Sequence, residues 1–177
     1  TSDVYVMAEA LAGGRGGTNF NDGNVGQFSY AHGESYNIPT EIRERRYPVE
    51  VEEYALHNEG GGYGRYRGGN GQVLTFKVLS DEAFLTGAFF CHSLPTWGIN
   101  GGFDGSVNYF EVIKNDGTVE QYSVSTNIHL VKGERIRLVT ATGGGYGDPE
   151  ERALSEVLSD VKNGYLTKEQ ASQFYNI

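Results

Sequence analysis

The sequence of 177 residues contains few cysteine, methionine, tryptophan and proline residues, and it has no long uninterrupted hydrophobic run. The single cysteine, Cys91, excludes a disulfide framework and a zinc site built from several cysteines. No apolar stretch approaches the roughly 20 residues that a membrane span needs. No signal-peptide pattern opens the chain either. We therefore expect a cytoplasmic protein that does not bind a membrane.

Positive charge is also scarce. The chain has 14 Lys and Arg against 23 Asp and Glu, which gives a net charge of -9. This balance argues against a nucleic-acid partner, because such binding depends on neutralising phosphates. With 38% hydrophobic and 21% charged residues, the composition is too apolar for a disordered chain. Length and composition together predict one folded domain over residues 1–177.

Glycine, by contrast, is abundant, with 26 residues. Turn formers fill residues 13–37, which predicts a long ordered loop. A loop of this length in a compact domain is usually functional or wrapped on a partner. Residues 3–12 are apolar and fit either a strand or a short helix. We therefore expect a long ordered loop region and an entry strand over residues 1–48.

Strand patterns dominate residues 49–141. The segment at 49–56 alternates apolar and charged side chains at its start, and several later segments are β-branched and aromatic. Asp116-Gly117 is a strong hairpin turn signal inside 107–125. The fold class predicted is mainly β: an antiparallel β-sandwich or barrel-like domain with two short C-terminal helices. The strands are expected at 49–56, 72–79, 84–90, within 107–125 as a hairpin, and at 134–141.

Helix signals are confined to residues 148–175. Asp148 is expected as an N-cap, Pro149 as the first helical residue and Glu151 as the partner in a capping box, with Gly164 ending the helix. A second short helix is expected from Thr167, with Gln170 three residues on, to about residue 175. The first helix is expected to bury an apolar stripe. The stripe consists of Leu154, Val157, Leu158 and Val161.

The segment GGGYGRYRGGNG, residues 60–71, resembles a phosphate-binding loop at first sight. A strand rather than a helix follows it, so it lacks the helix N-terminus that binds phosphate in such loops. Strand patterns on both sides also exclude a disordered tail. The segment is therefore interpreted as a rigid turn that presents Arg65 and Arg67. These arginines either bind loop carbonyls and acids such as Glu59, or bind a carboxylate or phosphate of a substrate or partner.

A second glycine run, residues 142–149, does precede a helix. However, Asp148, Glu150 and Glu151 occupy the first turn, where their carboxylates would repel a phosphate. We interpret this run as a loop that packs closely. The positions expected to matter through backbone geometry are Gly60, Gly61, Gly62, Gly64, Gly68, Gly69, Gly143, Gly144, Gly145, Gly147 and Asp148.

No catalytic centre assembles from the side chains alone. The histidines are not spaced as metal ligands, so no metal site is expected in this chain. Cys91 ends an apolar run and is expected to be buried, and Trp97 is expected to plug a corner rather than to serve as a stacking platform. The sequence does not identify the catalytic residues and offers four candidates for them. The candidates are Arg65, Arg67, His32 and Asp22, the last two as residues of a surface that faces a pocket.

Five segments together resemble one known family. They are EALAGGRGGTNFNDG, NIPTEIRERRYPVEVEEYAL, GGGYGRYRGGNG, PTWGINGGFDG and GGGYGDPEERALSEVLSDVKNGYLTKEQASQFY. In this order the chain resembles the C-terminal part of the hydantoinase B/5-oxoprolinase family, which includes subunits of acetone and acetophenone carboxylases. Two departures concern Glu59-Gly60, where the family commonly has Asp-Ser, and the ending Tyr175-Asn176-Ile177, where it often has Tyr-Gly-Val.

The resemblance implies a division of labour between chains. A separate hydantoinase A-like chain would bind ATP with Mg and phosphorylate the substrate or bicarbonate. The N-terminal portion of a B-type chain would hold a divalent metal, Zn or Mn. This chain would bind neither cofactor and would be a split subunit or a cleaved C-terminal piece.

Three functions follow as hypotheses. The first is a component of an ATP-dependent complex that hydrolyses a cyclic amide, such as a hydantoin or oxoproline. The second is a component of a biotin-independent, ATP-dependent ketone carboxylase. The third is a stand-alone β-rich module with a binding or scaffolding role.

Overall fold

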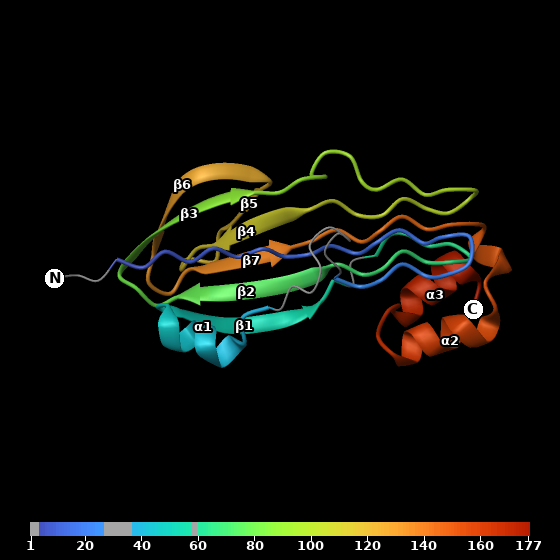
Figure 1. Cartoon of the computed structure of the whole chain (residues 1–177), viewed down its shortest axis with the longest axis horizontal. Coiled ribbons are helices and arrows are strands. Elements are labelled where there is room, and N and C mark those ends of the chain that lie inside the picture. Colours follow the sequence, from blue (N-terminus) through green and yellow to red (C-terminus); the bar gives the residue numbers. More distant parts are fainter. Residues whose placement is uncertain (1–3, 27–36, 58–59) are drawn as a thin grey trace.

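The computed structural model describes residues 4–26, 37–57 and 60–177. Its strands form a five-stranded and a two-stranded antiparallel sheet, and three short α-helices accompany them. The molecule is elongated, with the sheets at one end and α2 and α3 at the other, joined by long extended segments (Figure 1). This confirms the predicted mainly-β antiparallel fold with two C-terminal helices. Among the described strands, neither sheet closes into a barrel.

The central strands of the larger sheet carry many of its buried apolar side chains. Phe76 lies between Val51 and Ile136 of the neighbouring strands and is fully buried. A register shift between Val51 and Glu53 bends the outermost strand. The strand order is β1 (Val49–Leu56), β2 (Gln72–Val78), β7 (Arg135–Val139), β4 (Tyr109–Ile113) and β5 (Val119–Tyr122).

The smaller sheet pairs β3 (Glu82–Ala88) with β6 (Val124–Val131). One face of this pair packs on the larger sheet and the other faces outward. The apolar core between the two sheets is built from side chains of four strands, which exclude water from the interior. Its buried members are Val78, Val112, Leu130 and Ile136.

Most of the predicted strands are confirmed. β1 has the predicted bounds, 49–56, and the others at 72–79, 84–90 and 134–141 differ by no more than two residues at either end. The hairpin at Asp116-Gly117 joins β4 to β5, and Gly117 has a positive φ of 88°. β6 was not predicted as a separate strand. Its alternation is interrupted at Asn127, which takes a left-handed backbone with φ of 57°.

A helix, α1 (Thr40–Arg46), lies within residues 1–48 and was not predicted. Its sequence, TEIRERR, carries no apolar stripe. The helix is held instead by Arg43, whose side chain is buried over the ring of Phe76, 5.4 Å from the ring centroid, and pairs with Glu9 at 2.8 Å. Burial raises the pKa of Glu9, although the charge of Arg43 opposes this shift.

The predicted start of the first C-terminal helix is wrong. Asp148 does cap a helical turn, accepting a hydrogen bond from the backbone N–H of Glu150 at 3.0 Å, but that turn is a short 3-10 helix, η2 (Pro149–Glu151). The chain then becomes extended at Arg152, and α2 (Leu154–Lys162) begins without a side-chain cap. The ion pairs of Arg152 with Asp22 and Asp160 stabilise this interruption between η2 and α2.

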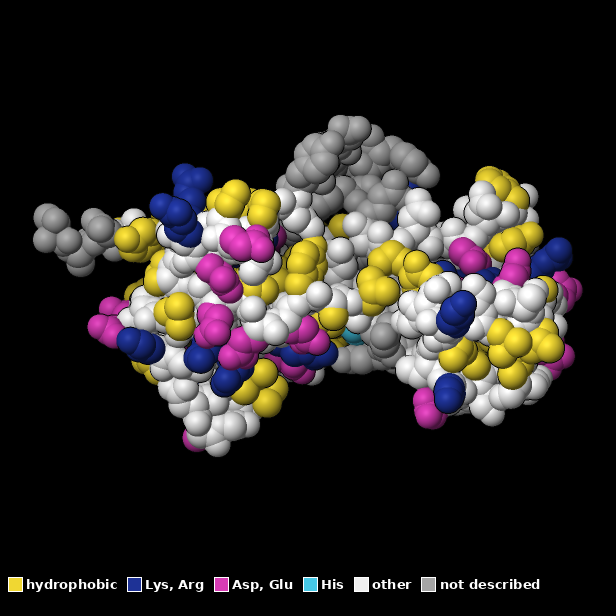
Figure 2. All heavy atoms as spheres, turned by 90° about the horizontal axis from the view of Figure 1, so that it is seen from below, with side chains coloured by type: hydrophobic (Ala, Val, Ile, Leu, Met, Phe, Trp, Pro, Cys, Tyr) yellow, Lys and Arg dark blue, Asp and Glu magenta, His cyan; other side chains and the backbone are white. Residues whose placement is uncertain are grey.

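The second helix agrees with the sequence. α3 (Lys168–Tyr175) begins with the capping box predicted between Thr167 and Gln170. The predicted stripe of α2 is only partly buried, because Val157 packs inward while Leu154 and Leu158 are more than half exposed. On the face shown in Figure 2, hydrophobic side chains gather on the helical end between charged ones.

Candidate functional site

Four extended glycine-rich segments join the sheets to the helices. They lie side by side (Figure 1) and are linked by backbone hydrogen bonds. The N–H of Gly69 donates to the carbonyl of Arg15 at 2.7 Å, and the N–H of Gly143 donates to the carbonyl of Gly69 at 2.9 Å. We call this region the glycine bundle; it consists of residues 13–26, 60–71, 97–105 and 142–147.

The backbones of the glycine bundle are in direct contact. A Cβ built on Gly143 would lie 2.0 Å from the carbonyl oxygen of Arg15, and one built on Gly69 would lie 2.0 Å from that of Asn24. Real Cβ atoms do not approach a carbonyl oxygen so closely, so these positions require glycine. Of the rigid turn predicted for residues 60–71, the structure shows a bend at Gly64 and Arg65, preceded by positive φ angles at residues 60–62.

An ion network fastens the glycine bundle to the helices. The Arg152 guanidinium donates to both carboxylate oxygens of Asp22, at 2.8 and 2.7 Å, and to Asp160 at 2.7 Å. Arg67 completes the network, with its Nε 3.1 Å from an Asp160 oxygen and its backbone N–H donating to Asp22 at 2.9 Å. Three distant parts of the chain therefore meet in one cluster, whose formal charges cancel.

Burial makes this network rigid rather than reactive. The side chain of Arg152 is 2% exposed. Burial disfavours its charge, but hydrogen bonding and the charges of Asp22 and Asp160 outweigh that effect and raise the pKa of the guanidinium. Arg67 also stacks over the ring of Tyr165, with its Cζ 4.2 Å from the ring centroid. Both guanidinium groups are therefore held in position by their neighbours.

Arg65 behaves differently from Arg67. Its side chain is 53% exposed at the tip of the bundle and pairs with Glu151 at 3.4 Å. A surface pair of this length contributes little to stability. Arg65 is therefore the candidate arginine that a ligand or partner can reach.

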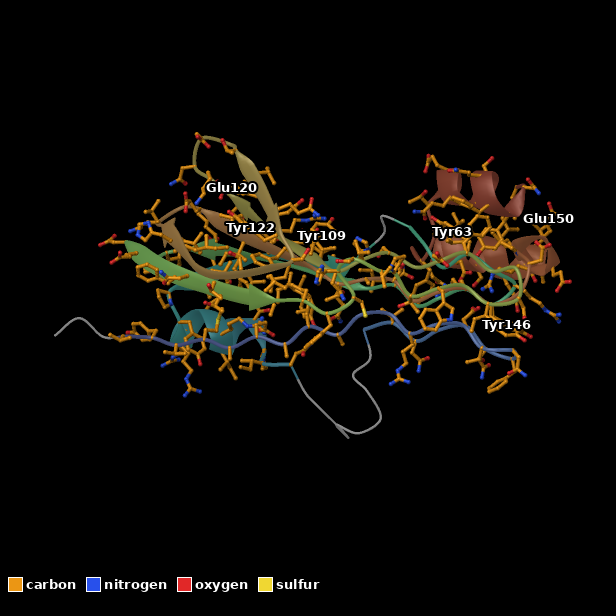
Figure 3. All side chains as sticks on the ribbon, turned by 90° about the horizontal axis from the view of Figure 1, so that it is seen from above. Tyr63, Tyr109, Glu120, Tyr122, Tyr146 and Glu150 are labelled. Atoms are coloured by element: carbon orange, nitrogen blue, oxygen red, sulfur yellow. The ribbon has the colours of Figure 1, made fainter. Side chains whose placement is uncertain are left out.

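An aromatic cluster packs beside the ion network. Tyr63 of the glycine bundle stacks on Phe174 of α3, with ring centroids 3.8 Å apart, and meets Tyr175 edge-on at 6.1 Å. Figure 3 shows Tyr63 at the helical end of the molecule. The Tyr175 hydroxyl lies 3.4 Å from the carbonyl oxygen of Gly64 and 3.3 Å from its nitrogen. Burial raises the pKa of Tyr175 to about 12.

A small pocket opens between the glycine bundle and the helical pair. The space that a water molecule can occupy inside it is only about 10 Å³. Its polar groups include the side chains of Arg67, Asn70 and Gln170. Asn70 is already engaged, since its amide donates to the backbone carbonyls of His57 and Tyr165, at 3.2 Å each.

The structure brings together two of the four candidates. Asp22 and Arg67 meet in the ion network, Arg65 stands apart on the surface, and His32 lies outside the described residues. Sequence reasoning missed Arg152 and Asp160. Asp160 carried a signal, because it stands three residues after the buried Val157 and hence on the same side of α2.

Two further expectations are wrong. Cys91 is exposed rather than buried, with a left-handed φ of 51°. The side chain of Trp97 is 74% exposed, so it does not plug a corner. Both lie in the segment that follows β3, where the side chains of Phe90 and Leu94 are exposed as well.

Metal ligands do not converge in the described part of the chain. There, no three His, Cys, Asp or Glu side chains gather in a way that could hold a metal ion. No described helix is both long and apolar enough to cross a membrane. That this chain binds no metal by itself stays a prediction.

Comparison with known proteins defines the family. The model of the hydantoinase B/oxoprolinase family matches residues 1–149. A Pseudomonas sp. protein named as the B-type component of a D-/L-hydantoinase is 33% identical over 177 residues, which cover 99% of this chain and 30% of that protein. The chain belongs to the hydantoinase B/oxoprolinase family.

Two solved structures resemble the fold. The ATP-dependent caprolactamase of Pseudomonas jessenii superposes with a TM-score of 0.75 and 28% identity, over 94% of this chain and 30% of that chain. Acetone carboxylase superposes with a TM-score of 0.76 and 22% identity, over 93% of this chain and 26% of that chain, a likeness of fold alone. The chain spans 24–30% of the length of the curated relatives it matches first.

Proposed function

We propose that this chain is the C-terminal component of an ATP-dependent amidohydrolase that opens a cyclic amide. The observation that carries this proposal is the alignment of 99% of the chain with a protein named as the B-type component of a hydantoinase. The likeness to an enzyme described as an ATP-dependent caprolactamase adds support, because a caprolactam is also a cyclic amide. Hydantoins, oxoproline and lactams are therefore the substrate class.

The remaining machinery is assigned to other chains. A hydantoinase A-like ATPase chain would bind ATP with Mg and phosphorylate the substrate. The N-terminal portion of a B-type chain would carry the divalent metal, Zn or Mn. This division is supported by the ion network, in which Arg67 and Arg152 pair with Asp22 and Asp160 and leave little net charge for a reacting group.

The second candidate is a component of an ATP-dependent ketone carboxylase. It is favoured by the likeness to acetone carboxylase, whose TM-score of 0.76 is similar to that of the caprolactamase. We keep the hydrolase as the first proposal because the sequence identity to the caprolactamase is higher, 28% against 22%. Bicarbonate-dependent ATP hydrolysis would reverse this order.

The experiment begins with the native assembly purified from the source of the protein. Its mass, chains and metals are measured, and ATP hydrolysis is followed with hydantoin, oxoproline, caprolactam, and acetone plus bicarbonate. We expect a large assembly with an ATPase chain whose ATP hydrolysis rises with a cyclic amide. A metal-free monomer near 19 kDa would contradict the proposal and favour a stand-alone binding or scaffolding module.

Arg65 is the residue for which we predict a direct role. In the assembly, Arg65→Ala is expected to lower ATP-coupled turnover at least about tenfold, because a charge-assisted hydrogen bond to an anionic group contributes about 1.5–3 kcal/mol. Glu151→Gln is the matched control, since it breaks the same surface pair but keeps the arginine. Equal turnover of Arg65→Ala and the unaltered chain, with the assembly intact, would assign Arg65 to scaffolding.

A further inference from the structure

We infer that one exposed apolar surface of this chain is the docking site for the N-terminal portion of a B-type chain. We call it the docking face, and the inference rests on the proposed function. It is formed by the segment that follows β3 together with the outward face of β3 and β6. Its apolar members are Phe84, Phe90, Leu94, Trp97 and Val124.

The side chains of the docking face are large and unusually exposed. Phe90 is 88% exposed, Leu94 80% and Trp97 74%. Phe84 and Val124 are also more than half exposed and lie on the same side of the small sheet. In Figure 1 the chain after β3 lies on the same side of the molecule as β3 and β6, opposite α1. Soluble monomers rarely expose neighbouring apolar groups of this size without a binding role.

The backbone beneath these side chains is well anchored. The N–H of Phe89 donates to Ser123 at 2.9 Å, and the N–H of Gly105 donates to Thr96 at 2.8 Å. The N–H of Ile99 donates to Gly145 of the glycine bundle at 2.9 Å. The apolar groups are therefore held outward by a fixed backbone, and docking need not order the segment first.

Charge is depleted from the second residue of β3 through the segment that follows it, while Glu82 at the start of β3 pairs with His129 at 3.1 Å. Residues 83–109 contain one Asp, Glu, Lys or Arg, namely Asp104, although 21% of the whole chain is charged. The Asp104 carboxylate accepts a hydrogen bond from the N–H of Gly98 at 2.7 Å, so it serves its own loop. Depletion of charge together with aromatic enrichment is typical of the buried core of a protein interface.

The occupant follows from what the family members share. The docking face lies within residues 1–149, the part that the family model matches. The curated relatives are three to four times as long as the part they share with this chain and their remaining length would supply the covering surface. The exposed pair Leu154 and Leu158 lies beyond residue 149 and is not assigned to this contact.

Cys91 provides a reporter inside the docking face. It is the single cysteine of the chain, and its thiol is exposed. The tagged chain is isolated from its source cells as an assembly, and its partners are identified by peptide mass spectrometry. Alkylation of Cys91 by iodoacetamide is then followed by the mass of this chain, in the assembly and after its separation. We expect alkylation at least about tenfold slower in an assembly that contains the N-terminal portion of a B-type chain.

Two double variants test which surface makes the contact. Phe90→Asp with Leu94→Asp is expected to weaken retention of the N-terminal portion at least about 30-fold, the effect of losing an interface hot spot. Leu154→Asp with Leu158→Asp is the matched control on α2, and retention is expected to stay within about threefold. Circular dichroism checks that each variant folds, as expected for substitutions at exposed positions.

The outcomes separate this inference from the proposed function. If the N-terminal portion is retained but Cys91 reacts equally fast in both states, the proposed function stands and the docking face is wrong. If slow alkylation accompanies a dimer of this chain alone, a second copy covers the face and the inference is overturned. If no B-type or ATPase chain is recovered and Cys91 reacts rapidly, both proposals fail.

Discussion

Two regions of this molecule, the sheet end and the glycine bundle, are held together in different ways. At the sheet end, apolar side chains such as Val112 and Leu130 fill the space between two layers of backbone. In the glycine bundle the backbones touch, and hydrogen bonds such as that from Gly143 to Gly69 replace the side-chain core. The first arrangement depends on volume and apolar area, and the second on the absence of a Cβ.

This difference determines what each end can present to other molecules. A bundle of touching backbones is thin and leaves the side chains at its tip and edges to make all further contacts. Arg65 and Trp97 stand on such edges, and both are exposed. The glycine bundle therefore presents single side chains at its tip and edges, while the sheets enclose an apolar core.

One methyl group added to the glycine bundle tests the contrast between the two regions most directly. Gly143→Ala is expected to destabilise the chain by about 4 kcal/mol or more, because its Cβ would overlap the carbonyl of Arg15. For a chain of this size that corresponds to a fall in melting temperature of about 8 °C or more, measured by circular dichroism.

Two control variants accompany Gly143→Ala. Gly117→Ala adds a methyl where nothing lies within 4 Å, and its cost is the positive φ alone, about 1 kcal/mol. Ile136→Val removes a methyl from the sheet core and is expected to cost about 1 kcal/mol. If Gly143→Ala cost no more than these two, the bundle would pack less tightly than the structure shows.

The second prediction concerns the charged link between the bundle and the helices. Asp160→Ala deprives Arg67 and Arg152 of a shared partner in a buried site and is expected to cost about 3 kcal/mol in urea unfolding. Glu156→Ala is the control, since this exposed carboxylate lies 3.9 Å from the same Arg152 and is expected to matter by less than about 0.5 kcal/mol. If the two variants lost similar amounts of unfolding free energy, apolar packing rather than the ion network would join the glycine bundle to the helices.

Sequence patterns predicted the sheet end better than the bundle. Alternation gave the bounds of β1, and Asp116-Gly117 located a hairpin. α1 was missed because the residue that buries it, Arg43, is charged. Local patterns report which face of an element is apolar, so they miss an element that is fixed by a buried ion pair.

The candidate site was predicted only in part for a related reason. Asp22 and Arg67 were singled out, yet the residues that join them, Arg152 and Asp160, come from far along the chain. No local pattern links positions 22 and 152. The exposure of Cys91 was also mispredicted, because an apolar run indicates burial without indicating whether the cover belongs to the same chain.

The smallest expected change in stability concerns the contact of the Tyr175 side chain with the backbone of the glycine bundle. The hydrogen bonds between the Tyr175 hydroxyl and Gly64 are long, at 3.4 and 3.3 Å. Tyr175→Phe is therefore expected to cost only about 0.5 kcal/mol at pH 7, measured by urea unfolding. Tyr5→Phe removes an exposed hydroxyl and serves as the control.

The effect of Tyr175→Phe changes with pH. In the folded chain burial raises the pKa of Tyr175 to about 12, above its value of about 10 in an unfolded chain. The unfolded state therefore loses its phenolic proton first, and the wild-type chain loses up to about 2.7 kcal/mol of stability as the pH rises from about 10 to about 12. The phenylalanine variant lacks this titration, so it becomes the more stable of the two in that range. A constant difference between the two chains from pH 7 to 12 would mean that water reaches the Tyr175 hydroxyl and that the helical pair seals the bundle less completely than the sheets seal their core.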